Sequence, residues 1–141
     1  MPKFSLKSQL ALDSCHPDLR MLFNTVINSF DCTVICGHRT EQQQRKAFEE
    51  KRSQLEWPSS NHNVYPSLAV DVIPYPIDWK DIPRINYFAG YVLGTAASLK
   101  AQGIISHKIR WGGDWDRDTQ LKDNQFNDLV HFELVHLHDL T

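Results

Sequence analysis

A short apolar run in the middle of the chain, residues 68–73, is interrupted by a single carboxylate. In a strand, Ala69, Asp71 and Ile73 share one face, while the residues between them share the other. A carboxylate within an otherwise apolar strand needs a partner, because an unpaired buried charge is costly. Any fold of this chain must therefore bring a partner to Asp71.

Two other segments offer candidate partners. His62 lies in the segment before this strand, and His131 lies near the end of the chain, with Asp128 three residues before it. Two imidazoles, one carboxylate and a second acid form the inventory of a catalytic zinc site, where three protein ligands leave one position for water. On spacing alone, the alternative is a hydrogen-bonded histidine and a solvated aspartate. The remaining histidines are expected to be hydrogen-bonded residues without a metal: His16, His38, His107, His136 and His138.

Length and charge exclude several classes of protein. A chain of 141 residues is the usual size of one domain, so we expect a single domain over residues 1–141. Fifteen basic and seventeen acidic residues give a formal charge of −2 without any block of like charge, so neither nucleic acid nor an anionic membrane is expected as a partner. No stretch approaches the ~20 apolar residues of a membrane span, and the first residues lack the apolar core of a signal peptide.

Hydrophobic periodicity predicts a mixture of helices and strands. Helices are expected at about 17–29, 40–50 and 85–99, and strands at 31–36, 68–73, within 104–111, and at 130–135. Thr40 and Gln43 form a capping box at the start of the second helix. Residues 52–67 lack a helical period and are expected to form a long loop, which is often functional. The odd number of cysteines predicts buried thiols rather than disulfides: Cys15, Cys32 and Cys36.

Arg39 lies between a predicted strand and the capped helix. A guanidinium in that position can hold a substrate carboxylate through two hydrogen bonds. The alternative is a surface arginine paired with a nearby glutamate.

The order of these motifs resembles that of a known family. Ser-x-His followed by Ala-x-Asp, and then a late Asp-x-x-His, is similar to the signature of zinc peptidases. These include D-alanyl-D-alanine carboxypeptidases and dipeptidases, and the L-alanyl-D-glutamate endopeptidases of phage endolysins. Segments 30–41, 65–79 and 110–115 resemble the compact phage branch, so the resemblance extends over almost the whole chain.

This resemblance implies a fold and a site. The fold would be a small α+β domain with a central antiparallel sheet and packed helices, as in hedgehog and DD-peptidase domains. The residues that would bind one Zn²⁺ ion are His62, Asp71 and His131, and Asp128 would be the catalytic base.

Two further residues and a biological role follow from the same resemblance. Arg39 would hold a substrate carboxylate or polarise the scissile carbonyl, and Ser60 would contact either the substrate or the metal ligands without binding the metal itself. The implied activity is hydrolysis of the L-alanyl-D-glutamate bond of the peptidoglycan stem peptide by a phage or prophage endolysin. Such an enzyme would be a monomer, made in the host cytoplasm without a signal peptide, and would reach the cell wall once the membrane is permeabilised.

Two alternatives remain open at this stage. The first is a D-alanyl-D-alanine carboxypeptidase, with the same metal site but a pocket that requires a free C-terminal carboxylate. The second is a non-catalytic zinc module that only binds the wall or a protein partner.

Overall fold

The structure of the chain is a computed structural model that describes residues 2–120 and 128–136. The helices in these residues are α1 (Leu6–Asp13), α2 (Pro17–Val26), α3 (Glu41–Glu49), the short 3-10 helix η1 (Asn61–Asn63) and α4 (Ile82–Ala101). The strands are β1 (Cys32–Cys36), β2 (Ala69–Pro74), β3 (Ile109–Gly112) and β4 (Asp128–Leu134).

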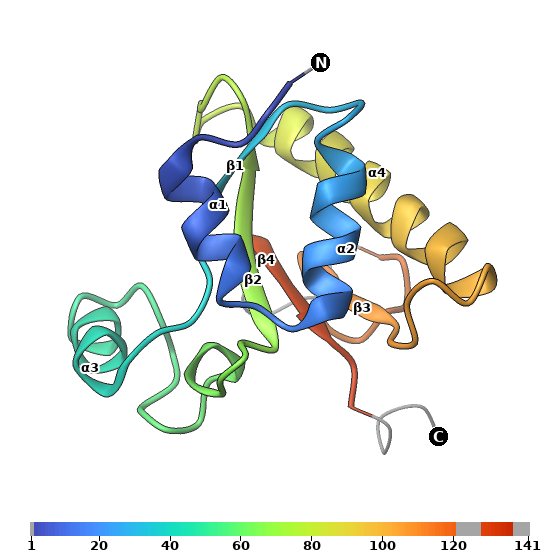
Figure 1. Ribbon diagram of the computed structural model, residues 1–141. Coiled ribbons are helices and arrows are strands. Elements are labelled where there is room, and N and C mark those ends of the chain that lie inside the picture. Colours follow the sequence, from blue (N-terminus) through green and yellow to red (C-terminus); the bar gives the residue numbers. More distant parts are fainter. Residues whose placement is uncertain (1, 121–127, 137–141) are drawn as a thin grey trace.

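The strands form one antiparallel sheet in the order β1-β2-β4-β3 (Figure 1). All six residues of β2 are buried, because β1 and β4 lie on either side of this strand and both α4 and η1 contact it. β2 pairs with β4 so that Asp71 lies directly opposite His131. The α+β fold with a central antiparallel sheet is therefore confirmed.

The main core lies on one face of this sheet, between the strands and α1, α2 and α4. α2 packs on α4, and α4 contacts β2, β3 and β4. The ring of Phe132 in β4 meets Phe23 of α2 and Phe88 of α4 edge-on, with ring centroids 5.5 and 6.4 Å away. Because side chains alternate along a strand, the neighbours of Phe132, His131 and Glu133, lie on the other face.

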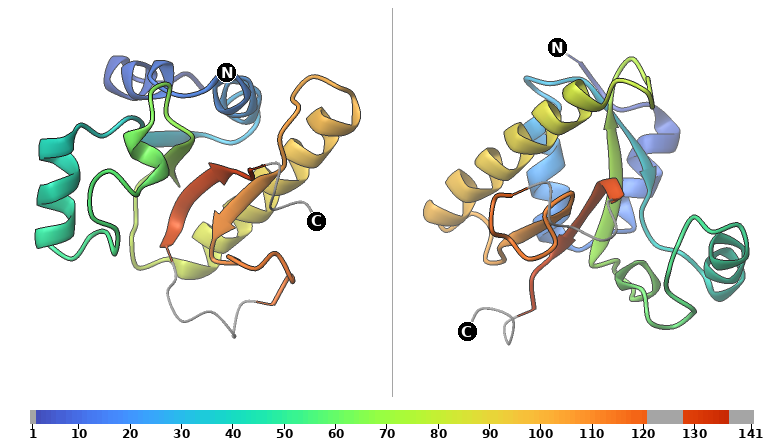
Figure 2. Two further views of the ribbon diagram at one scale, coloured as in Figure 1. Left: turned by 90° about the horizontal axis from the view of Figure 1, so that it is seen from below. Right: turned by 180° about the vertical axis from the view of Figure 1, so that it is seen from behind.

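α3 stands apart from this core (Figures 1 and 2). The helix begins with the predicted capping box. The Thr40 side chain accepts a hydrogen bond from the Gln43 backbone, and the Gln43 side chain accepts one from the Thr40 backbone. The predicted loop 52–67 returns from α3 to the sheet and contains η1 near its end.

The predicted helices and strands are present, with shifted ends. α4 begins at Ile82, earlier than expected, because Asp81 caps it and a proline occupies its first turn. β4 begins at Asp128 rather than at residue 130, so the candidate base is part of the strand that carries His131.

α1 was not predicted from the sequence, because this helix has no continuous apolar stripe. Leu6 and Leu10 are exposed; Leu12 alone of the helix's leucines is buried in the core, and a polar contact also joins the helix to the sheet. The buried Ser8 hydroxyl lies 3.1 Å from the Val34 backbone nitrogen, from which it accepts a hydrogen bond. A serine side chain thus satisfies part of the edge strand β1, and hydrophobic periodicity does not record such a contact.

The cysteines are free thiols, as expected. Cys15 and Cys32 are buried, whereas Cys36, the last residue of β1, is half-buried. In the part of the chain that the structure describes, no helix has both the length and the apolar surface needed to cross a membrane.

Candidate metal centre and active site

His62, Asp71 and His131 meet on the open face of the sheet, and all three side chains are buried. The Asp71 Oδ1 atom lies 3.3 Å from His62 Nε2 and 3.2 Å from His131 Nδ1, and the two nitrogens are 3.3 Å apart. Ligand atoms around a tetrahedral zinc ion with bonds of about 2.0–2.1 Å are separated by about 3.3–3.4 Å. The donor set and its spacing therefore fit one zinc ion.

Each of the three residues is positioned by a different part of the fold. Asp71 and His131 are register partners on β2 and β4, so backbone pairing fixes their separation. His62 is in η1, where the Ser60 hydroxyl accepts a hydrogen bond from the His62 backbone at 3.1 Å. His62 Nδ1 lies 2.7 Å from the Gly37 carbonyl, which can only accept, so Nδ1 donates and Nε2 faces the cluster.

Gly37 has a steric role in this arrangement. A Cβ atom at this position would collide with the Ala11 carbonyl oxygen and the Ser14 hydroxyl at the end of α1. The end of α1 therefore packs against Gly37, whose carbonyl orients His62.

Asp128 lies beside the triangle rather than in it. Its Oδ2 atom is 3.9 Å from His131 Nδ1, and its side chain is 29 % exposed at the pocket. Burial, together with the negative charge of Asp71, raises the pKa of Asp128 above the ordinary aspartate value. A carboxylate that is accessible, close to the metal position and raised in pKa has the properties of a general base.

Arg39 approaches the triangle from the start of α3. Its Nη2 atom lies 3.4 Å from Asp71 Oδ2, and its Nη1 atom donates to the Gln44 side chain at 2.9 Å. The alternative of a surface arginine paired with a glutamate is wrong, because the partner is the buried Asp71. Only 12 % of the Arg39 side chain is exposed, and the residue lines the pocket in front of the triangle.

A pocket of about 670 Å³ opens in front of the triangle. Its lining includes Arg39, Arg52, Leu55, Ser60, Trp115 and Asp128. The Trp115 ring leans over His131 with ring centroids 5.3 Å apart. Residues 52–55 and 59–62 of the predicted loop 52–67 line this pocket, so the place of the loop in the structure agrees with the expectation that it is functional.

Three residues that support the site were not predicted: Gln44, Arg110 and Glu133. Gln44 is fully buried; its amide nitrogen donates to Ser53 and to the Leu55 carbonyl, and its oxygen accepts from Arg39 and Asn63. This side chain joins α3, the pocket wall and the turn that carries His62. Polar residues on a polar helix give no pattern that marks such a position.

Glu133 lies on the same face of β4 as His131, two residues further along. Burial raises its pKa, but hydrogen bonds and charges from His131 and Arg110 outweigh burial and lower the pKa of Glu133 to about 2. Glu133 is therefore an ionised carboxylate next to a candidate ligand. In the sequence, only the alternation of Glu133 with Phe132 indicated that the Glu133 side chain lies on the same face of the strand as His131.

Asp71 is also ionised. Burial alone raises the pKa of a carboxyl group, but the neighbouring His62 and His131 lower the pKa of Asp71 well below its usual range. In return, Asp71 outweighs the effect of burial on the imidazoles and raises the pKa of His62 to about 10 and the pKa of His131 to about 9. In the metal-free cluster we therefore expect both imidazoles to carry a second proton, and with it a positive charge, at neutral pH.

Zinc binding is therefore expected to release protons, and its affinity is expected to rise with pH between pH 6 and 8. A metal ligand must be deprotonated, so zinc displaces the protons that the raised pKa values keep on the imidazoles, about one to two per ion. Calorimetric titration in buffers of different ionisation enthalpy measures this number. An identical heat in every buffer would contradict the protonated state of the metal-free cluster.

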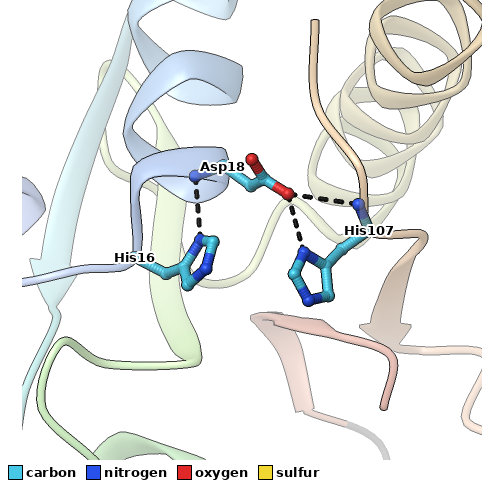
Figure 3. A group of neighbouring side chains, drawn as sticks. All are labelled: His16, Asp18 and His107. Carbon is cyan, nitrogen blue, oxygen red and sulfur yellow. Dashed lines mark hydrogen bonds and ion pairs between the residues drawn. The ribbon is translucent and has the colours of Figure 1, made fainter. Parts of the chain in front are cut away.

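A second His-Asp-His group lies away from this pocket (Figure 3). His16 caps α2: its Nδ1 accepts a hydrogen bond from the Asp18 backbone at 3.0 Å. One Asp18 oxygen accepts from the Ser106 and His107 backbones and from His107 Nδ1 at 2.7 Å. These bonds attach α2 to the segment before β3, so we assign the group to the fold. His16 and His107 are thus hydrogen-bonded, as expected.

The other histidines lie outside the triangle. The ring of His38 packs edge-on against Tyr65, with centroids 5.3 Å apart. His136 follows β4, and His138 lies outside the described residues.

A buried triangle of two imidazoles and a carboxylate, with a second acid beside it and a pocket in front, is the arrangement of a hydrolytic metal centre. The crystal structure of the L-Ala D-Glu endopeptidase ChiX of Serratia marcescens has a similar fold. The match has a TM-score of 0.67 and 21% sequence identity, and it covers 94% of this chain and 90% of that chain. No curated protein matches the chain by sequence.

The family model described as phage L-alanyl-D-glutamate peptidase matches residues 1–135. The chain therefore belongs to the phage L-alanyl-D-glutamate peptidase family, and the resemblance seen in the sequence motifs is confirmed.

Proposed function

We propose that this protein is a zinc-dependent peptidoglycan endopeptidase that hydrolyses the bond between L-alanine and D-glutamate in the stem peptide. The observation that carries this proposal is the triangle of His62, Asp71 and His131, whose spacing suits a zinc ion and which faces a pocket beside an accessible acid. Membership of the phage L-alanyl-D-glutamate peptidase family indicates which bond is hydrolysed. The biological role that fits this chemistry is degradation of the host wall by a phage enzyme.

In the proposed mechanism, the three residues of the triangle hold the ion and Asp128 moves the proton. The chemistry that bound zinc supplies is polarisation of the scissile carbonyl and a lower pKa of the attacking water. Asp128 accepts the proton from that water and passes it to the leaving amine of D-glutamate. The new carbon–oxygen bond forms first; the carbon–nitrogen bond then breaks as the carbonyl double bond re-forms and the amine nitrogen takes the proton from Asp128.

The pocket has a charge that suits the substrate. Arg39 and Arg52 both line it, and the D-glutamate that follows the scissile bond carries a free carboxylate. Guanidinium groups bind carboxylates with directed, charge-assisted hydrogen bonds. The two arginines therefore favour an acidic residue on the leaving side of the bond.

Digestion of purified peptidoglycan by the zinc-loaded protein, followed by mass spectrometry of the products, tests the function and the choice of bond together. We expect released stem peptides that begin with D-glutamate, with L-alanine left on the glycan. Loss of a terminal D-alanine alone would show a carboxypeptidase. Unchanged muropeptides, from a protein that retains zinc, would show a binding module without this activity.

Replacing Arg39 with alanine is expected to lower kcat/KM by about 10–10²-fold, because it removes a charge-assisted hydrogen bond to the substrate carboxylate, which is worth about 1.5–3 kcal/mol. The substitution also frees Gln44 and Asp71 from their contacts with the guanidinium. Hydrolysis of a defined muropeptide measures the change. Arg45→Ala is the matched control, because Arg45 pairs with Glu41 on the exposed side of α3. Equal rates for Arg39→Ala and Arg45→Ala would exclude a role for Arg39.

A further inference from the structure

The two nitrogens of His131 face different partners. Nδ1 points into the triangle, 3.2 Å from Asp71 Oδ1, whereas Nε2 lies 2.7 Å from Glu133 Oε1. An imidazole that binds a metal is neutral and carries one proton, on the nitrogen that does not contact the ion. An ionised carboxylate can only accept a hydrogen bond. Contact with Glu133 therefore favours the tautomer with the proton on Nε2 and a free lone pair on Nδ1.

Glu133 is itself held in place from the next strand. Arg110 is its register partner on β3, and Arg110 Nη2 and Nε donate to Glu133 Oε2 at 2.7 and 3.2 Å. One carboxylate oxygen thus accepts from Arg110 and the other faces His131. Only 8 % of the Glu133 side chain is exposed, so water competes little for either oxygen.

We propose that Glu133, anchored by Arg110, is a positioning residue that holds His131 with Nε2 protonated and Nδ1 presented to the zinc ion. The inference rests on the proposed zinc function and adds two residues to it. A hydrogen bond from the second nitrogen of a metal-binding histidine to a carboxylate fixes the ring and increases the basicity of the ligand. The row Arg110, Glu133, His131 and Asp71 crosses three strands of the sheet, so backbone pairing maintains its order.

Glu133→Gln is the sharpest test, because glutamine has the same shape but replaces one acceptor with a donor. Its oxygen can face His131 or Arg110 but not both, so an N–H group must meet another N–H group. We expect the zinc dissociation constant, measured by competition with a chromophoric chelator, to rise about 10–100-fold. Glu41→Gln is the matched control, because it removes the same charge from an exposed glutamate–arginine pair. Its zinc affinity should equal that of the unmodified chain.

A second variant removes the anchor and leaves the carboxylate. Arg110→Met is expected to weaken zinc binding by about 10-fold, the smaller end of the range for an outer hydrogen-bond partner. If Glu133→Gln does not fold, as judged by circular dichroism, Arg110→Met decides the question. Unchanged zinc affinity in the folded variant overturns the proposal.

Nitrogen NMR of the zinc-loaded protein reads the tautomer directly. Long-range proton–nitrogen correlations should show His131 with a protonated Nε2 and an unprotonated Nδ1, and Glu133→Gln should shift the Nε2 proton resonance. A protonated Nδ1 in the zinc-loaded chain overturns the proposal. If Glu133 instead contacts only substrate, Glu133→Gln raises KM and leaves both zinc affinity and the His131 spectrum unchanged.

The unmodified chain separates this inference from the function on which it rests. Failure of that chain to retain zinc would overturn the proposed function itself. Normal zinc retention and wall hydrolysis, combined with unchanged affinity in both variants, would overturn only the role of Glu133.

Discussion

Alanine in place of His131 or Asp71 is expected to abolish zinc retention, and hydrolysis with it. Each substitution removes one corner of a triangle whose sides are 3.2–3.3 Å, and two protein ligands do not make a catalytic zinc site. Loss of an outer hydrogen-bond partner already weakens metal binding by about 10–100-fold. Loss of a direct ligand should exceed that range.

Elemental analysis after dialysis against zinc-free buffer measures this effect. We expect one zinc ion per unmodified chain and a content near zero in either variant. His107→Ala is a matched control, since it removes one histidine from the other His-Asp-His group and should leave the zinc content at one per chain. Retention of a full equivalent by Asp71→Ala would exclude the triangle as the metal site. Two ions in the unmodified chain would contradict our assignment of His16, Asp18 and His107 to the fold.

Asp128→Asn is expected to keep zinc and to lower the hydrolysis rate by about 10²–10⁴-fold, the usual contribution of a general base. Asparagine preserves the shape of the side chain but cannot accept the proton. Zinc should stay bound because Asp128 Oδ2 lies 3.9 Å from His131 Nδ1, beside the triangle and not at one of its corners.

The pH profile gives this prediction a second measurement. A base works only when ionised, and burial together with Asp71 raises the pKa of Asp128. At saturating zinc, the rate of the unmodified chain should therefore fall as the pH decreases through that raised pKa, and this acid limb should be absent in Asp128→Asn. Asp13→Asn, at an exposed position on α1, is the control for loss of an acidic charge. A normal rate of wall digestion by zinc-loaded Asp128→Asn would exclude Asp128 as the base.

Much of the fold was predictable because it depends on local patterns. The apolar stripe of α2 and the capping box of α3 each depend on residues only a few positions apart, and the structure contains both. α1 was not predictable in this way. It is held by Ser8 against the backbone of β1 and by the close approach at Gly37, and both contacts involve residues about 25 positions away.

The candidate site likewise contains residues that the sequence indicated and residues that only the fold identifies. The residue types pointed to zinc chemistry, since two histidines and an aspartate are suitable ligands wherever they meet. The supporting residues could not be found, because Gln44, Arg110 and Glu133 are ordinary polar residues until the fold places them. Gln44 acts through four hydrogen bonds to three separate segments, and Glu133 acts through its register partner on β3.

The sequence by itself determined most of the helices and strands, though not α1, together with the residues that could bind a metal and the family that the motifs resemble. Only the tertiary structure decided that the elements converge: antiparallel pairing of β2 and β4 sets Asp71 opposite His131, and η1 carries His62 to the same point. The physical reason is that helix and strand periodicity is a property of neighbouring residues. The position of a hydrogen-bond partner sixty residues away depends instead on how the strands are ordered in the sheet.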